Sequence, residues 1–144
     1  MQNAEQRSIF ESKQESRLLG LDEGAKNLLI ARSADGTVSA AVPGMIDVYM
    51  LSLQDGTQTK INSFGNAYFH NIQLSLDGRT IAFVSRQDDT TALWTVPVNG
   101  GAPKRLLVEN DPKVLFSTLA WAPDGRSIVF GKQTRTNLLS MLAK

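Results

Sequence analysis

Apolar and polar positions alternate in short runs along this chain, and two of the runs are near copies of each other. Residues 74–85 read LSLDGRTIAFVS, and residues 121–132 read WAPDGRSIVFGK. In each copy Asp-Gly separates two runs of period two, a pattern typical of an antiparallel hairpin with one buried face. The Asp-Gly pair supports the hairpin because glycine adopts positive φ and the aspartate side chain bonds the nearby backbone. The pattern therefore predicts a repeated β-hairpin.

The spacing of the copies predicts a repeat architecture. Asp77 and Asp124 lie 47 positions apart, which is within the range of β-propeller blades. A weaker copy, LDEGAKNLLIA, occupies residues 21–31, and a second hairpin follows each first one, with Tyr49 aligned to Trp94. The first unit is longer by eight residues, which fall in the connection 32–46. Because insertions in repeat arrays collect at binding rims, we expect a binding surface there.

The sequence thus predicts an all-β fold, a partial β-propeller of about three four-stranded antiparallel blades. Residues 1–16 are expected to be an N-terminal extension, either a short strand or a frayed helix, and the blades to span about 17–64, 65–111 and 112–144. The third blade lacks its outer strand. The predicted strands are 17–21, 27–31, 47–53 and 57–62 in the first blade, 69–74, 80–85, 92–98 and 104–108 in the second, and 115–120, 127–131 and 137–142 in the third.

Three blades are too few to close a ring of four to eight, so the array has exposed edges. Three interpretations stay open at this point. In the first, the chain is the C-terminal piece of a longer propeller. In the second, two copies form a six-bladed ring as a homodimer. In the third, the chain is a two-sheet β domain that contains the repeat without being a propeller. In the first two cases the stretch 8–11 is a candidate for the missing outer strand.

Composition and charge exclude several classes of function. The net charge is +1, so no strong field attracts nucleic acid or an anionic membrane surface. No apolar window reaches the length of a membrane span, and membrane insertion is not expected. Cysteine is absent, which excludes disulfides, thiolate zinc sites and cysteine nucleophiles. The first residues are polar and resemble no signal peptide, so the compartment stays open.

The polar residues considered as candidates for catalysis or metal binding are better explained by structural roles. His70 is the only histidine, and neither a Gly-x-Ser-x-Gly motif nor a second histidine accompanies it. Asp22, Asp77 and Asp124 are interpreted as turn residues, and the pair at 88–89 as an exposed hairpin tip. No calcium-loop or phosphate-loop motif occurs. We therefore predict no catalytic residue, no cofactor and no metal site.

A partner-binding rim is the remaining candidate. Tyr49 and Trp94 occupy equivalent strand positions and are expected to pack between blades, whereas Trp121 precedes a turn and is expected to be reachable from a rim. The candidate rim residues are Val38, Pro43, Met45, His70, Asp88, Asp89 and Trp121.

Three segments resemble the repeat of TolB-type, WD-like propellers, namely APDGRSIVF at 122–130, LWTVPVNGG at 93–101 and SLDGRTIAFVS at 75–85. The first unit departs from the repeat, with Glu23-Gly24-Ala25 in place of Pro-Asp-Gly, and Ser75-Leu76 replaces Ser-Pro in the second. The resemblance implies a non-catalytic bacterial module that binds other proteins, with a periplasmic location favoured.

Two other functions fit the same resemblance, because a propeller fold does not fix function. One is the gating propeller of a prolyl oligopeptidase-type serine peptidase. The other is the C-terminal sensory module of a bacterial regulator or kinase.

Overall fold

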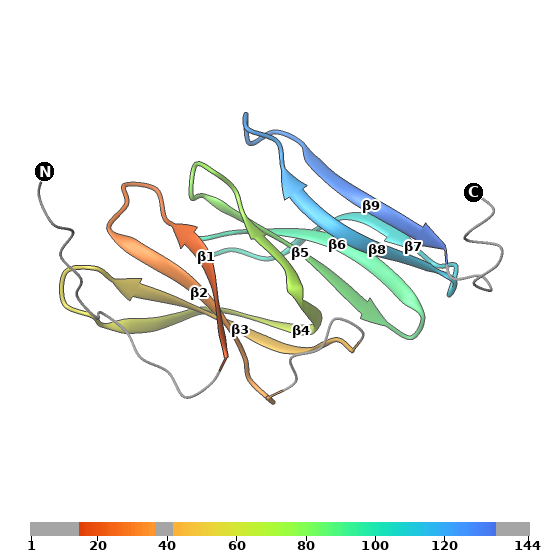
Figure 1. The fold of residues 1–144 in the computed structure, drawn as a ribbon, viewed down its shortest axis with the longest axis horizontal. Helices are drawn as coiled ribbons and strands as arrows, with labels where there is room; N and C mark the ends of the chain where they lie inside the picture. Colours follow the sequence, from red (N-terminus) through yellow and green to blue (C-terminus); the bar gives the residue numbers. More distant parts are fainter. Residues whose placement is uncertain (1–14, 37–41, 135–144) are drawn as a thin grey trace, which may run out of the picture.

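The computed structural model describes residues 15–36 and 42–134, and this part of the chain forms nine β-strands and no helix (Figure 1). The strands are β1 (Ser16–Leu21), β2 (Asn27–Ser33), β3 (Gly44–Ser52), β4 (Gln58–Leu74), β5 (Thr80–Gln87), β6 (Thr90–Pro97), β7 (Lys104–Glu109), β8 (Val114–Trp121) and β9 (Ile128–Thr134).

The strands form two antiparallel sheets, in which each strand pairs with its neighbour in the sequence. One sheet has seven strands in the order β1 to β7, and the other consists of β8 and β9. The first half of β4 pairs with β3, and the second half pairs with β5. We therefore divide the strands into a first leaflet (β1, β2, β3 and the first half of β4), a second leaflet (the second half of β4, β5, β6 and β7) and a third leaflet (β8 and β9). Figure 1 shows the leaflets side by side, from the red strands on the left to the blue ones on the right.

The long strand β4 corrects the predicted strand pattern. The sequence predicted separate strands at 57–62 and 69–74, as the last strand of one blade and the first strand of the next, with the turn-forming pair Gly65-Asn66 between them. Asn66 does adopt positive φ, 54°, but the backbone stays extended around it. Ala67 pairs with Gly44 on one side and with Ser85 on the other, so the strand passes from one leaflet to the next without a loop.

Side chains join the first strands of the three leaflets to one another. Arg17 on β1 donates to the carbonyl of Phe69 on β4 at 3.1 Å. Asn71 on β4 donates to the carbonyl of Phe116 on β8 at 3.4 Å. The first strands therefore lie next to each other along one side of the array, with the later strands of each leaflet farther out. This arrangement is that of a partial β-propeller, whose innermost strands surround a common axis.

The core consists of two apolar layers, one between each pair of neighbouring leaflets. Strand β5 is buried on both faces, so its residues alternate between the layers. Ile81 and Phe83 enter the layer toward the first leaflet, and Ala82 and Val84 the layer toward the third, as the period of two requires. Burial of each large apolar side chain contributes about 1.5–3 kcal/mol. The first layer contains Leu29, Ala31, Ile46, Val48, Phe64, Ala67, Phe69, Ile72, Ile81, Phe83, Val96 and Val98. The second contains Tyr68, Ala82, Val84, Leu93, Val114, Phe116 and Leu119.

Strand register supports the repeat alignment. Tyr49 lies opposite Ile30, and Trp94 lies opposite Phe83, at equivalent places in the two leaflets. The connection between β2 and β3 is eight residues longer than that between β5 and β6. The predicted strand at 137–142 and most of the extension 1–16 lie outside the described residues, and the blade limits stay a prediction.

Candidate functional site

Three turns with one shared construction connect the first two strands of each leaflet. The backbone N–H before each turn donates to the carbonyl five residues on, from Asp22 to Asn27, Ser75 to Thr80 and Ala122 to Ser127. The turn of the first leaflet carries Gly24-Ala25 where the other two carry Asp-Gly. Asp22 is therefore a turn residue, as predicted, but it stands at the place of Ser75 and not at the place of Asp77 and Asp124.

The turn aspartates hold backbone and hydroxyl groups. Asp77 accepts from the Ser75 hydroxyl at 2.6 Å and from the Arg79 N–H at 3.0 Å, and these bonds lower the pKa of Asp77. Asp124 accepts from the Arg126 N–H at 2.9 Å. Each carboxylate thus closes its own turn, as the sequence predicted for these two residues.

Asp22 serves its turn in a different way. It accepts from the backbone N–H of Asn27 at 2.9 Å and from that residue's side-chain amide at 2.9 Å. Burial raises the pKa of Asp22, but the hydrogen bonds from Asn27 and Lys26 outweigh burial, and the pKa is lowered.

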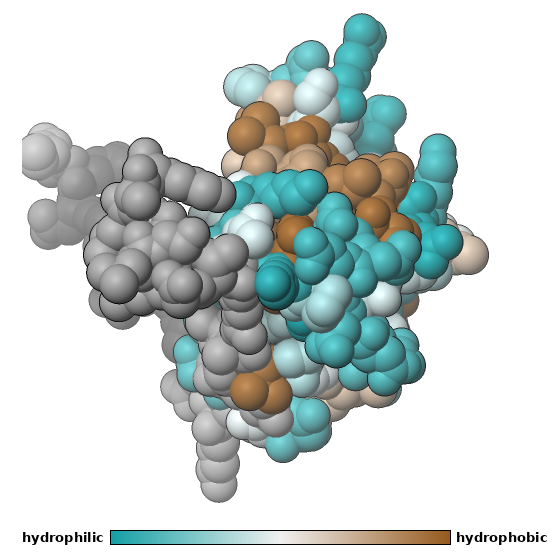
Figure 2. All heavy atoms as spheres, turned by 90° about the vertical axis from the view of Figure 1, so that its right-hand side faces the viewer, coloured by the Kyte–Doolittle hydropathy of each residue, from teal (hydrophilic) through white to brown (hydrophobic). Residues whose placement is uncertain are grey.

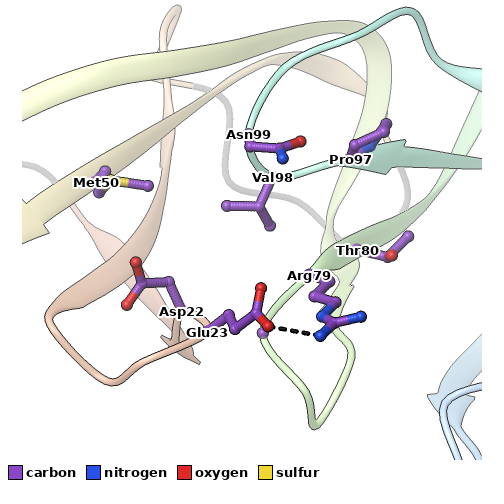
Figure 3. A pocket seen from close by; sticks show the side chains of 9 residues that line it. Asp22, Glu23, Met50, Arg79, Thr80, Pro97, Val98 and Asn99 are labelled. Carbon is purple, nitrogen blue, oxygen red and sulfur yellow. Dashed lines mark hydrogen bonds and ion pairs between the residues drawn. The ribbon is translucent and has the colours of Figure 1, made fainter.

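The turns of the first and second leaflets pack directly on each other. A Cβ atom at Gly78 would lie 2.4 Å from the backbone of Asp22 and Glu23. Beside this contact Arg79 pairs with Glu23 at 2.6 Å, although both side chains are mostly exposed. The two turns border a cavity of about 460 Å3, with Met50, Pro97, Val98 and Asn99 on its other sides (Figure 3). Because Glu23 and Arg79 neutralise each other, this cavity presents no unpaired charge from that pair to a ligand.

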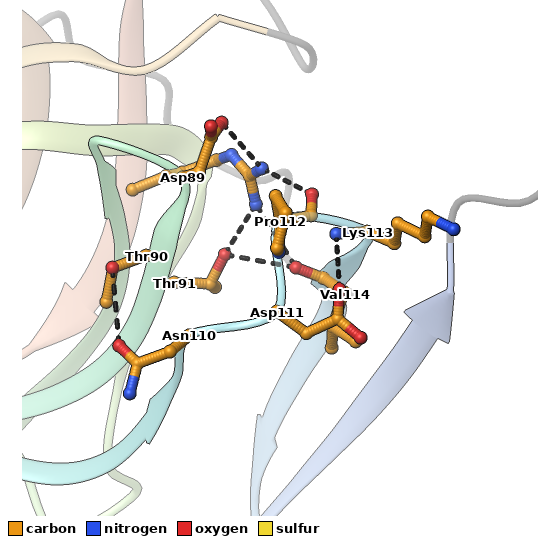
Figure 4. A network of polar contacts seen from close by, with 9 residues as sticks. Asp89, Thr90, Thr91, Asn110, Asp111, Pro112, Lys113 and Val114 are labelled. Atoms are coloured by element: carbon orange, nitrogen blue, oxygen red, sulfur yellow. Dashed lines mark hydrogen bonds and ion pairs between the residues drawn. The ribbon is translucent and has the colours of Figure 1, made fainter.

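At the opposite end of the second leaflet, Arg86 joins the β5–β6 hairpin to the β7–β8 connection, whose residues 110–114 are drawn in Figure 4. Its guanidinium donates to the carbonyls of Pro112 at 2.7 Å and Val114 at 3.1 Å, and to the Thr91 hydroxyl at 2.8 Å. Its ion pair with the exposed Asp89 is longer, at 3.4 Å. Sequence reasoning missed Arg86, because no local pattern distinguishes it from other arginines that follow a strand.

The candidate rim residues do not form one surface. Met45 and Asp88 lie at the end of the leaflets where β2 and β5 finish, with Pro43 and Asp89 beside them. Trp121 lies at the other end, where β8 enters its turn, and its indole N–H donates to the carbonyl of Gln73 at 3.1 Å.

Exposure differs among these residues. Asp88 and Asp89 are exposed, with positive φ of 50° and 63°, and form the hairpin tip that the sequence indicated. Met45 is 42% exposed, and Pro43 and Trp121 are half-buried. His70 is exposed on β4, with its ring edge-on to Phe69. Val38 lies outside the described residues.

An opening lined by aromatic rings lies next to Met45, and we call it the aromatic pocket. Phe64 and Phe83 stack with ring centroids 4.0 Å apart, and Phe83 and Trp94 are parallel at 6.2 Å. The cavity has a volume of about 190 Å3 and is also lined by Ser63, Gly65, Asn66, Ser85, Gln87 and Pro103.

Polar contacts fix the wall of the aromatic pocket. Trp94 donates to the Ser85 hydroxyl at 2.8 Å, which holds the indole in place. The Ser63 hydroxyl contacts the Met45 sulfur at 3.3 Å, so this exposed methionine adjoins the pocket. Tyr49 takes part in neither core layer and instead packs beneath the guanidinium of Arg32, 4.6 Å from the ring centre. The expectation that Trp94 packs between leaflets is therefore confirmed, whereas that for Tyr49 is wrong within the described residues.

Residues 15–36 and 42–134 bring together no group of three or more histidine, aspartate or glutamate side chains able to hold a metal ion. The same residues include no helix with the length and apolar character needed to cross a membrane.

These features define the class of the chain as a partial β-propeller whose repeated turn residues are structural. Comparison with solved structures shows which propellers its fold is similar to. It is similar to a protein described as a TolB from Agrobacterium tumefaciens, with 22% identity and a TM-score of 0.60 over 88% of this chain. It is also similar to TolB from Acinetobacter baumannii, with 20% identity and a TM-score of 0.57 over 85% of this chain. The chain thus has a TolB-type propeller fold.

The chain spans 42% of the length of the first of these structures and 28% of the second. No protein-family model and no curated protein matches it.

Proposed function

We propose that this chain is a non-catalytic propeller module that binds another protein through the end of the leaflets carrying the aromatic pocket. The observation that supports it most is an apolar opening, floored by stacked rings and bordered by a partly exposed methionine, next to the longest connection between strands. Aromatic residues and methionine are the side chains most enriched in protein interfaces. A pocket of about 190 Å3 is large enough for one apolar side chain of a partner and too small for most organic cofactors.

The polar residues support the same proposal. The turn carboxylates of Asp77 and Asp124 are engaged by their own backbones, and Arg86 is engaged by carbonyls. None of these groups has the partners of a general base or nucleophile. The peptidase and sensory alternatives depend on domains beyond these residues, and no contact described above favours either. A periplasmic location, implied by the resemblance to TolB-type repeats, belongs to the proposal.

The experiment that tests it uses a displayed library of random peptides selected against the full chain. We expect enriched peptides to share an aromatic, proline or leucine anchor. Met45→Glu should weaken their binding about tenfold, the equivalent of about 1.4 kcal/mol, because a carboxylate at the pocket edge opposes entry of an apolar group.

The control is Leu76→Glu, which places the same charge on a 76%-exposed leucine in the β4–β5 turn at the other end of the leaflets. It should leave binding unchanged. Equal binding by the wild type and the Met45 variant, or failure to enrich any peptide, would contradict the proposal.

Closure of the ring by a second copy is part of the same proposal. Leu18 on β1 is 63% exposed and Val129 on β9 is 66% exposed, each on the face turned away from the second leaflet. In a dimer, the exposed face of β1 in one copy would pack against the exposed face of β9 in the other, as the faces of neighbouring blades do. Light scattering should then report about twice the chain mass of 15.7 kDa, reduced to the single mass by Leu18→Glu. A single mass for the wild type would exclude the two-copy ring.

A further inference from the structure

Arg105 places a positive charge beside the aromatic pocket. It lies opposite Trp94 in the pairing of β6 with β7, and Trp94 lies opposite Phe83 on β5. Directly opposed residues on neighbouring strands point to the same face, so all three side chains face the first leaflet. The guanidinium of Arg105 lies over the Trp94 ring, 6.0 Å from the ring centre. Because Phe83 and Trp94 also line the pocket, the row of rings ends in a cation on the outer strand.

A β-bulge in β7 puts Arg105 on this face. Residues two apart on a regular strand point the same way. Leu107 nevertheless lies opposite Leu93, which belongs to the core layer toward the third leaflet. The register shifts between the two pairs, so Leu106 is an extra residue in β7. Lys104, one position before Arg105 in regular pairing, points toward the third leaflet as Leu107 does.

The charge of Arg105 is available to a ligand. Arg105 is exposed, and it takes part in none of the ion pairs formed within residues 15–36 and 42–134. Its neighbour Trp94 is uncharged. Stacking occupies the flat face of a guanidinium, whereas the N–H groups lie in its plane and can bind a carboxylate at two points. Arg105 is therefore suited to receive a carboxylate beside the pocket.

The opposite border of the aromatic pocket is negative. Asp47 lies opposite Ser63 and accepts from the Ser63 hydroxyl at 2.7 Å. Ser63 lines the pocket and contacts Met45 as well. A carboxylate of a ligand is thus repelled on this border and attracted at Arg105. A polyanion such as nucleic acid would meet both charges, so a single carboxylate fits this arrangement better.

We infer that the partner segment bound by the aromatic pocket carries an acidic residue next to its apolar anchor. The anchor enters the pocket, and the carboxylate of the acidic residue pairs with Arg105. Asn66 and Gln87 are exposed and line the pocket, and their side-chain amides can pair with the backbone of an extended peptide. This inference rests on the proposed function, to which it adds the charge of the segment and the direction in which it lies.

The test uses the peptides selected on the full chain from the random library. We expect the enriched sequences to carry aspartate or glutamate next to the apolar anchor. The affinity of one such peptide, and of its analogue with the corresponding amide in place of the acid, is then measured for the wild type and for Arg105→Gln. The variant should bind the acidic peptide about threefold more weakly, as expected for an exposed ion pair, and the amide analogue equally well.

Two control variants locate the effect. Lys104→Gln removes the same charge one position earlier, on the opposite face of β7, and should leave the affinity unchanged. The second control concerns another apolar surface. Figure 2, which views the molecule from the side of β7–β9, shows hydrophobic atoms gathered there. Leu107 borders a cavity between the second and third leaflets on this side, and Leu107→Glu should not affect binding of the selected peptides.

The outcomes separate this inference from the proposed function. Enriched peptides with an apolar anchor and no acidic residue would overturn the inference and leave the proposed function standing, as would equal losses from Arg105→Gln and Lys104→Gln. Equal weakening of the acidic peptide and its amide analogue by Arg105→Gln would show that Arg105 only supports the Trp94 ring, which would also overturn the inference. Failure to enrich any peptide would contradict the proposed function and the inference together.

Discussion

Replacement of Gly78 by alanine tests how the first two leaflets are held together. Gly78 has a φ of +74°, and an added Cβ would lie 2.4 Å from the backbone of Asp22 and Glu23. Gly125 is the matched position in the third leaflet. Its φ of +71° is nearly the same, but its nearest neighbour, a carboxylate oxygen of Asp77, would lie at an ordinary 3.6 Å. The two variants therefore share the conformational cost and differ in the steric one.

The magnitudes follow from these two contributions. A left-handed alanine costs roughly 1–2 kcal/mol, and the loss of glycine's freedom in the unfolded chain returns about 0.4–1 kcal/mol. Gly125→Ala should therefore lower the free energy of unfolding by about 1 kcal/mol. Gly78→Ala must also separate two packed turns, since backbone cannot yield as a flexible side chain does. Overpacking of this kind adds about 1–3 kcal/mol, so we expect a total of about 2–4 kcal/mol.

Urea unfolding followed by tryptophan fluorescence measures both values, because Trp94 and Trp121 lie in different core layers. A difference of about 2 kcal/mol between the variants corresponds to roughly 6–10 °C in melting temperature for a domain of this size. Equal destabilisation by the two substitutions would refute the reasoning, since it would mean that the contact between the turns carries no steric constraint.

Three further predictions concern single sites. Ala25 has a φ of 55° at the place where the other turns carry glycine, so Ala25→Gly should raise the free energy of unfolding by about 0.5–1 kcal/mol in the same urea assay. Arg86→Met should lower it by about 2–3 kcal/mol, because the carbonyls of Pro112 and Val114 lose a charged donor, and hydrogen exchange should increase at 110–114. Hydrogen bonds lower the pKa of Asp77 and Asp22 in the folded state. The two carboxylates therefore contribute to the free energy of unfolding at neutral pH, and this contribution should be lost as pH falls from about 5 to 2. Asp77→Asn should flatten this part of a curve of unfolding free energy against pH.

The hairpins of the fold could be predicted from neighbouring residues in the sequence, whereas features that depend on pairing between distant residues could not. The Asp77-Gly78 turn and the alternation in 80–85 depend on neighbours in the sequence, so the hairpin could be recognised without a structure. The continuity of β4 could not, because Gly65-Asn66 resembles a turn until both halves of the strand have found their partners. The same reason hid Arg86, whose carbonyl partners lie 26 and 28 residues away.

The candidate site was predictable only in part. The long connection 32–46 pointed to the end of the leaflets where Met45 and the aromatic pocket lie, since an insertion is visible in the spacing of the repeats. The aromatic pocket was not visible, because Phe64 and Phe83 belong to different leaflets and stack only after the leaflets pack. Trp121 was expected to be reachable, yet its N–H is bound to a carbonyl of β4, a contact that links two leaflets.

The two ends of the leaflets differ in how neighbouring leaflets are joined. At the Gly78 end, the turns of the first and second leaflets touch backbone to backbone, so a longer turn in either leaflet would displace the other. At the Arg86 end, β4 passes from the first leaflet to the second through Ala67, and the arginine side chain links the second leaflet to the β7–β8 connection. The β2–β3 connection carries its eight extra residues at this second end, beside the aromatic pocket. The insertion and the pocket thus lie together at the end of the leaflets opposite the tightly packed turns.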